Sequence, residues 1–160
     1  MYRKEAGGDQ KTYNALAFKI NIPNGATIEK AIFTCTNLET YRAPPQNNIY
    51  FRTASPTKSL DFLRTCKYNR KANLEDIVGE WEFPSGSTLV TGKEVSSDGV
   101  KNVLQHFIQH SSYTPGTYFQ LVMFNGYAGK MFTSKNRIRV LCTNQSKDKL
   151  TQPRLYVEWS

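Results

Sequence analysis

The sequence has no long run of uncharged apolar residues. A helix that crosses a bilayer needs about 20 consecutive apolar residues, and charged or strongly polar side chains interrupt every apolar stretch of this chain before that length. The first residues, Met1–Gly8, carry no apolar segment of the kind that a secretory signal peptide has behind its basic residues. We therefore expect a soluble protein that is made in the cytoplasm and does not insert into a membrane.

Cysteine is scarce, with 3 residues in 160. Cys35, Cys66 and Cys142 are an odd number, contain no Cys-X-X-Cys pair and have no histidine nearby in the sequence. Small disulfide scaffolds and structural zinc sites depend on such closely spaced ligands. We expect three reduced thiols that are buried in the fold.

Sequence motifs typical of enzymes are missing too. The chain has no Gly-X-Ser-X-Gly nucleophile motif, no phosphate-binding glycine loop and no Cys–His arrangement. Glu80 and Glu82 share one face of a predicted strand, whereas the two carboxyl groups of a glycosidase face each other across a sugar. His106 and His110 lie four apart on a predicted helix, without the glutamate of His-Glu-X-X-His and without a third ligand. We predict no catalytic residue, no metal and no cofactor.

Basic residues outnumber acidic ones, which gives a formal net charge of +8. Such a charge favours contact with nucleic acid, anionic membranes, acidic polysaccharides or acidic proteins. Two segments, 64–71 and 135–139, concentrate it locally. They can form a nucleic-acid-binding surface, but we prefer to interpret them as solvated loops and strand faces, because the other basic residues are scattered.

Most of the chain consists of short runs of β-branched and aromatic residues, with proline and glycine between them, as in strands and turns. Apolar residues occupy every second position from Leu16 to Ile22, the period of a half-buried strand. A Pro-Asn-Gly turn leads from there to a strand over 27–36, expected as a hairpin arm or a neighbouring strand. Further strands are predicted over residues 49–54, 78–83, 88–91, 118–124, 131–142 and 154–159, with a short helical turn over 60–63.

One segment has a different period. From Val100 to Ile108 the apolar residues recur three and four positions apart, which predicts one amphipathic helix near 97–110. Ser96 or Ser97 can cap this helix, and Asp98 suits the positive end of its dipole.

This pattern of about eight strands and one embedded helix predicts a mainly β protein. Short connections that contain turns favour antiparallel pairing, and the whole indicates a two-sheet antiparallel β-sandwich of the jelly-roll kind. We expect residues 1–12 to be a flexible arm or an edge strand, and residues 13–160 to form a single domain.

Three blocks of the sequence follow one another in an order that resembles a known type of domain. Residues 17–31 read AFKINIPNGATIEKA, the predicted helix 98–109 is followed by Gly116 and the strand 118–124, and residues 132–135 lead to a closing PRLYVEW. In this order the blocks resemble the DNRLRE-type domain, a β-sandwich of bacterial surface and secreted proteins that is grouped with carbohydrate-binding modules. The resemblance implies a β-sandwich that binds carbohydrate within a longer secreted or surface protein.

The leading functional hypothesis is a non-catalytic structural or binding protein. A single module without a signal peptide and with free thiols suits a component that enters a particle inside the cell. We therefore expect a bacteriophage virion protein, such as a capsid decoration, head fibre or tail component, that acts through protein partners and can form oligomers. A carbohydrate-binding module and a basic nucleic-acid-binding module are the alternatives.

Tyr127 is the candidate binding residue. It lies in the turn 125–129 between two predicted strands, and exposed aromatic side chains stack on sugars or anchor protein interfaces. Packing of the Tyr127 ring on its own sheet is the competing interpretation. Trp81 lies on the apolar side of its alternation, and we assign it to the core.

The periodicity leads to a stability prediction. Replacing Phe18 or Leu104 with alanine should lower the free energy of unfolding by about 2–5 kcal/mol if both side chains are buried. Urea denaturation measures this loss. A change below about 0.5 kcal/mol, the size typical of surface substitutions, would show that the strand and helix faces are wrongly assigned.

Overall fold

The computed structural model describes residues 13–37, 40–42, 47–58, 74–83, 87–125, 140–141 and 152–160. Within them one α-helix, α2 (Lys101–Gln109), and a short 3₁₀ helix, η1 (Pro56–Lys58), accompany ten strands. The strands are β1 (Tyr13–Lys19), β2 (Ile28–Asn37), β3 (Tyr41–Arg42), β4 (Asn47–Thr53), β5 (Gly79–Phe83), β6 (Thr88–Leu89), β7 (Glu94–Ser97), β8 (Tyr118–Asn125), β9 (Val140–Leu141) and β10 (Arg154–Trp159).

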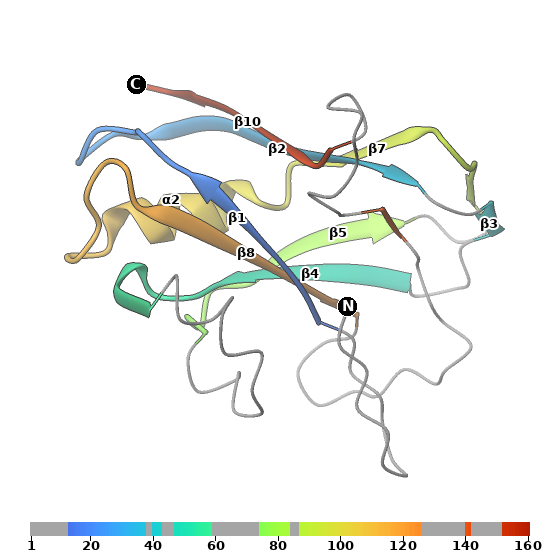
Figure 1. The fold of residues 1–160 in the computed structure, drawn as a ribbon, viewed down its shortest axis with the longest axis horizontal. Helices are drawn as coiled ribbons and strands as arrows, with labels where there is room; N and C mark the ends of the chain where they lie inside the picture. The colour runs from blue at the N-terminus through green and yellow to red at the C-terminus, as the bar shows by residue number, and fades with distance from the viewer. Residues whose placement is uncertain are drawn as a thin grey trace, which may run out of the picture.

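The strands form two main sheets that face each other. One sheet has the order β1-β8-β4-β5 and the other the order β10-β2-β7, with β9 also paired to β2; β3 and β6 form a small separate ladder. Every pair of strands is antiparallel. Figure 1 shows the β10-β2-β7 sheet above the other, with α2 between them. The mainly β, two-sheet antiparallel sandwich is therefore confirmed, and its jelly-roll form stays a prediction.

The chain changes sheet between β1 and β2. The expectation that these two strands form a hairpin or lie side by side is wrong, because β1 pairs with β8, while β2 pairs with β10 and β7. Side chains from elsewhere hold the backbone of the connecting segment. The Tyr113 hydroxyl donates to the Ile22 carbonyl at 2.8 Å, and the Gln105 amide donates to the Ala26 carbonyl at 3.2 Å and accepts from the Ile28 N–H at 2.6 Å.

Aromatic rings fill the space between the sheets. The ring of Phe33, on β2, is fully buried. Its centroid lies 6.4 Å from that of Phe18 on β1, 5.9 Å from that of Phe51 on β4 and 6.1 Å from that of Trp81 on β5, all with edge-to-face geometry. Such arrangements add to the stabilisation from area burial alone. The assignment of Trp81 to the core is confirmed.

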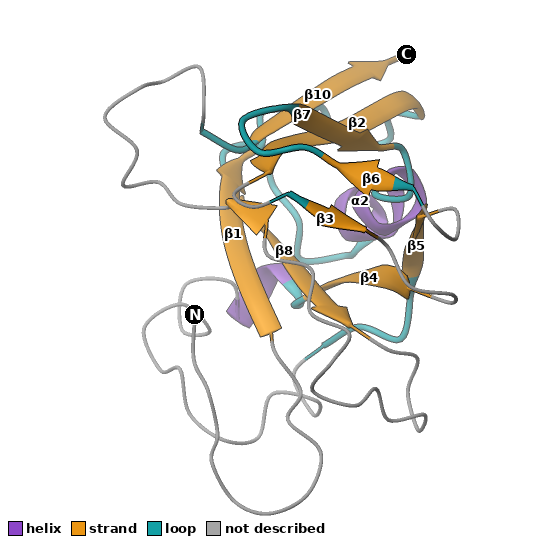
Figure 2. Ribbon diagram, turned by 90° about the vertical axis from the view of Figure 1, so that its right-hand side faces the viewer, coloured by secondary structure: helices purple, strands orange, loops and turns teal. Residues whose placement is uncertain are grey.

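The helix α2 lies between the two sheets and packs against β2, β4 and β5 (Figure 2). Val103, Leu104, Phe107 and Ile108 are buried, as the periodicity predicted. The ring of Phe107 lies 5.1 Å from that of Phe119 on β8, which ties the helix to the four-stranded sheet. Leu104 is fully buried and Phe18 only half-buried, so we expect the larger loss from the leucine.

The predicted start of the helix is wrong, because residues 94–97 form β7 and α2 begins only at Lys101. Neither predicted cap acts on the helix. The Ser96 hydroxyl is 2.8 Å from the Thr34 hydroxyl of the neighbouring strand. The Ser97 hydroxyl accepts from the Gly99 N–H at 3.1 Å, which closes a turn before the helix.

Some expectations fall outside the described residues. They are the arm over 1–12, the helical turn over 60–63 and most of the strand over 131–142, of which the structure describes Val140–Leu141. Ile20 and Ile22 are buried as expected, although β1 ends at Lys19.

Two glycines allow the start of β5 and the turn before α2 to touch. A Cβ atom at Gly79 would collide with the carbonyl oxygen of Gly99, and a Cβ atom at Gly99 would collide with that of Glu80. Both obstacles are backbone atoms, which cannot rotate away. The position of α2 between the sheets therefore depends on glycine at both sites.

We expect Gly79→Ala or Gly99→Ala to lower the free energy of unfolding by about 3 kcal/mol, since each forces two packed backbones apart. Gly92→Ala is the matched control. Gly92 has a φ of 77°, but a Cβ atom at this residue would meet no other atom within 4 Å. We therefore expect a loss of about 1 kcal/mol from conformational strain alone. Urea denaturation that gives equal losses for all three variants would contradict the close approach.

Candidate functional surface

β10 is an edge strand, with β2 on one side. Within the described residues no strand pairs with its other side. The ladder with β2 continues to the last residue of the chain. The Thr27 N–H donates to the Ser160 carbonyl at 2.8 Å, and the Ser160 N–H donates to the Thr27 carbonyl at 3.0 Å. Pro153 directly precedes the strand, a position where its missing N–H removes no hydrogen bond from the ladder.

This edge strand displays large side chains. Tyr156 is 53% exposed and Trp159 47% exposed, and the Arg154 side chain is 46% exposed. We define the β10 surface as Arg154, Tyr156, Glu158 and Trp159, together with Lys30 of β2. Tyrosine, tryptophan and arginine are the residue types enriched among the strongest contributors to protein interfaces.

Polar contacts order this surface. The Tyr156 hydroxyl donates to Glu158 Oε1 at 2.6 Å. Lys30 Nζ lies 5.8 Å from the centroid of the Tyr156 ring, within the range of a cation–π contact. Arg154 forms an ion pair with Glu94 of β7, and this ion pair crosses over the strand β2 that lies between them. The Tyr156 side chain thus contacts a positive side chain at its ring and a negative side chain at its hydroxyl.

Trp159 departs from its expected environment. In the alternating sequence of β10, Leu155, Val157 and Trp159 point to one side of the strand and Tyr156 and Glu158 to the other. Leu155 and Val157 do pack against the core, but Trp159 is half exposed. The pairing with β2 shifts register between Glu158 and Trp159, close to the end of the sheet. Here the sandwich no longer covers the indole.

The contact with Glu158 affects the titration of Tyr156. Its hydrogen bond to the carboxylate and the negative charge of that group both favour the neutral phenol, so they raise the pKa of Tyr156 above its ordinary value of 10.0. Tyr113 also has a raised pKa, for a different reason. Burial of the Tyr113 side chain disfavours its charged phenolate and so raises the pKa.

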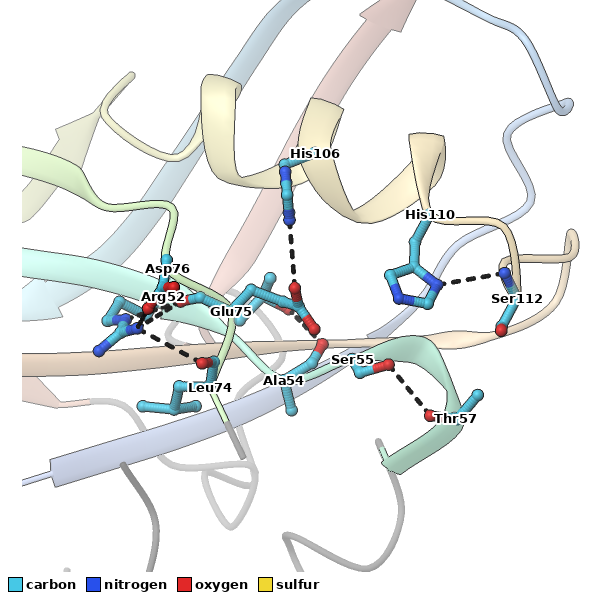
Figure 3. A network of polar contacts seen from close by, with 11 residues as sticks. Arg52, Ala54, Ser55, Thr57, Leu74, Glu75, Asp76, His106, His110 and Ser112 are labelled. Carbon is cyan, nitrogen blue, oxygen red and sulfur yellow. Dashed lines mark hydrogen bonds and ion pairs between the residues drawn. The ribbon is translucent and has the colours of Figure 1, made fainter. Parts of the chain in front are cut away.

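A second polar cluster joins β4 to the segment before β5 (Figure 3). The Arg52 guanidinium donates to the Glu75 carbonyl from Nε at 2.8 Å and from Nη2 at 2.6 Å. It also contacts the Asp76 carboxylate at 3.2 Å. Only 13% of the Arg52 side chain is exposed. Its donors therefore serve to hold residues 74–76 against the sheet.

The two histidines of α2 have separate partners. His106 Nε2 is 3.3 Å from Glu75 Oε2, whereas His110 Nδ1 accepts from the Ser112 N–H at 3.1 Å (Figure 3). Among the described residues, no three His, Cys, Asp or Glu side chains are grouped to hold a metal. Glu80 and Glu82 lie on one strand, β5, as predicted, and both are exposed.

Several sequence candidates lie outside the described residues. They are Tyr127, the thiols of Cys66 and Cys142, and the basic segments 64–71 and 135–139. Cys35 is buried as a reduced thiol, which confirms the expectation for that residue.

Sequence reasoning placed β10 correctly but did not single out its surface. A signal was present, because Tyr156 is a large aromatic residue on the polar side of an otherwise regular alternation. The neighbours Lys30 and Glu94 were hidden, since they come from strands far away in the sequence.

Comparison with known proteins adds no relative. No protein-family model, no curated protein and no solved structure matches this chain. The resemblance to the DNRLRE-type domain therefore remains a hypothesis. No helix in the described part of the chain is long and apolar enough to cross a membrane.

Spectrophotometric titration of the phenols tests the order of the β10 surface. We expect Glu158→Gln to lower the pKa of Tyr156, because the substitution removes the negative charge that opposes ionisation. The absorbance difference between each protein and its Tyr156→Phe derivative isolates this one phenol. An unchanged pKa would show that the Tyr156–Glu158 contact does not persist in solution.

Proposed function

We propose that this chain is a non-catalytic assembly protein, and that it binds its protein partners through the β10 surface. Its proposed setting is a bacteriophage virion, as a capsid decoration, head fibre or tail component. β-Sandwich and jelly-roll domains recur in viral capsids. Because one fold serves many functions, the proposal depends on the surface more than on the fold.

The observation that carries the proposal is the composition and exposure of β10. Three residue types that dominate binding energies at protein interfaces occur within six residues of one edge strand, and all three side chains are about half exposed. Fixed contacts to Lys30, Glu94 and Glu158 order the tyrosine and the arginine before binding. Less side-chain entropy is then lost when a partner binds.

Carbohydrate binding is a second candidate, and one observation favours it. Tyr156 and Trp159 present aromatic surface beside carboxylate and ammonium groups that can bond to sugar hydroxyls. Affinity electrophoresis in acidic and neutral polysaccharides tests this candidate. Stacking on sugars should persist in high salt, whereas binding driven by the charge of +8 to polyanions, nucleic acid included, should weaken steeply.

The decisive experiment locates the chain. Quantitative mass spectrometry would compare density-purified virus particles from the source culture with the envelope and secreted fractions. We expect enrichment in the particles at a fixed ratio to the main capsid protein. Recovery only in the secreted or envelope fraction would contradict the virion assignment and make carbohydrate the partner to test.

The same assay tests the surface. We expect the double variant Tyr156→Ala/Trp159→Ala to enter particles at least about tenfold less than the parent chain, since such truncations remove the largest contributions to binding. Tyr118→Ala is the matched control, because Tyr118 is 39% exposed but belongs to β8 in the other sheet. Circular dichroism checks that both variants fold. Equal incorporation of the double variant and the control would exclude the β10 surface.

A further inference from the structure

The sequence of β10 is complementary to itself when reversed. Reading outward from Tyr156, the first neighbours are Leu155 and Val157, both apolar, and the second neighbours are Arg154 and Glu158, of opposite charge. An antiparallel pair of identical strands centred on Tyr156 therefore places unlike charges opposite each other twice. It also places apolar residues opposite apolar residues and the two tyrosines face to face.

The backbone N–H and C=O groups that an antiparallel partner strand would need lie on the open side of β10. The N–H and C=O of Ser160 both bond to Thr27 of the β2 side. The register shift between Glu158 and Trp159 adds its extra residue to β2, so the alternation of these groups along β10 is not interrupted. The N–H and C=O groups of Glu158, Tyr156 and Arg154 therefore face β2 as well. The N–H and C=O groups of Leu155 and Val157 face away from β2, where no described strand pairs with them.

We propose that two copies of this chain pair antiparallel through β10, with Tyr156 on the twofold axis. Leu155 of one copy and Val157 of the second exchange backbone hydrogen bonds, while the tyrosines form a non-hydrogen-bonded pair, in which side chains approach most closely. The two β10-β2-β7 sheets then join into one. Figure 1 shows β10 at the rim of the sandwich, with the C-terminus at its end.

The contacts within one copy are compatible with this pairing. Arg154 already bonds to Glu94, but a guanidinium has five N–H donors and its side chain is 46% exposed, so it can also reach Glu158 of the second copy. On the outer face, Glu158 lies opposite Lys30 of its own sheet. A row of alternating charge thus continues across the axis, and such opposite-charge pairs stabilise neighbouring strands.

The inference names one partner for the protein-binding function proposed above, and it rests on that proposal only in choosing a protein as the partner. One short strand from each copy buries less than a standard interface. We therefore expect a dissociation constant on the order of 10–100 µM. Sedimentation equilibrium of the full chain measures it. A monomer at all concentrations up to about 1 mM would overturn the proposal.

Charge reversal tests the pairing. Arg154→Glu alone places two glutamates opposite each other at both ends of the interface, and we expect dimerisation to weaken by about tenfold or more. The swap Arg154→Glu/Glu158→Arg restores opposite charges and should restore the dimer. Lys19→Glu makes the same change in net charge on β1 and should have little effect. A dimer that Arg154→Glu leaves intact, or that the swap does not restore, would overturn the proposal.

Cysteine crosslinking tests the register. Facing Cα atoms at the axis lie about 5 Å apart, a distance that a disulfide spans. We expect Tyr156→Cys to form a crosslinked dimer under mild oxidation, above the background of the parent chain with its own three cysteines. Arg154→Cys is the matched control, since its two copies would lie about 14 Å apart. Equal crosslinking of the two variants would exclude this register.

The outcomes separate this inference from the proposed function. A monomeric chain that is still recovered in virus particles would overturn the β10 pair and leave the assembly function standing. A dimer that is found only in the secreted fraction would contradict the virion function and leave the β10 pair standing.

Discussion

The structure depends on the burial of Phe33. Its ring meets aromatic rings from three strands of the opposite sheet at about 6 Å, so it holds the two layers together at one point. A shift of one residue along β2 would move this ring to the outer face. The registers of both neighbouring strands follow from it, because Phe33 lies opposite Leu155 of β10 and Ser97 of β7. With Leu155 fixed on the core side, Tyr156 must face outward.

Local periodicity made much of the fold predictable, but not the partners of the strands. The alternation over Arg154–Trp159 gave the bounds of β10, and the helical spacing identified the buried residues of α2. Pairing depends on contacts between distant segments. β1 and β2 are adjacent in sequence, yet they lie in opposite sheets, and their apolar residues meet across the core. The touching backbones of Gly79 and Gly99 likewise arise only when β5 and the turn before α2 meet.

The two ordered arginines show why exposure distinguishes a structural contact from a binding surface. Arg52 is largely buried, and backbone carbonyls accept its hydrogen bonds. Removing the Arg52 guanidinium would take away these hydrogen bonds, and the resulting loss in the free energy of unfolding exceeds what a surface contact contributes. Arg154 forms its ion pair in solvent, where such a pair contributes little to stability. Its orientation is therefore more important for contacts that another molecule can make than for the fold.

The edges of the two sheets differ in how they meet a second copy. Among the strands that the structure describes, β5 is an edge of the four-stranded sheet, and Glu80 and Glu82 flank its central Trp81 on the exposed face. Antiparallel self-pairing about Trp81 would place glutamate opposite glutamate, and like charges in that position repel. β10 instead flanks its central tyrosine with one positive and one negative residue. Charged residues often protect an edge strand from association. Their order along β5 disfavours self-pairing, whereas their order along β10 supplies the complementary charges on which the proposed pair depends.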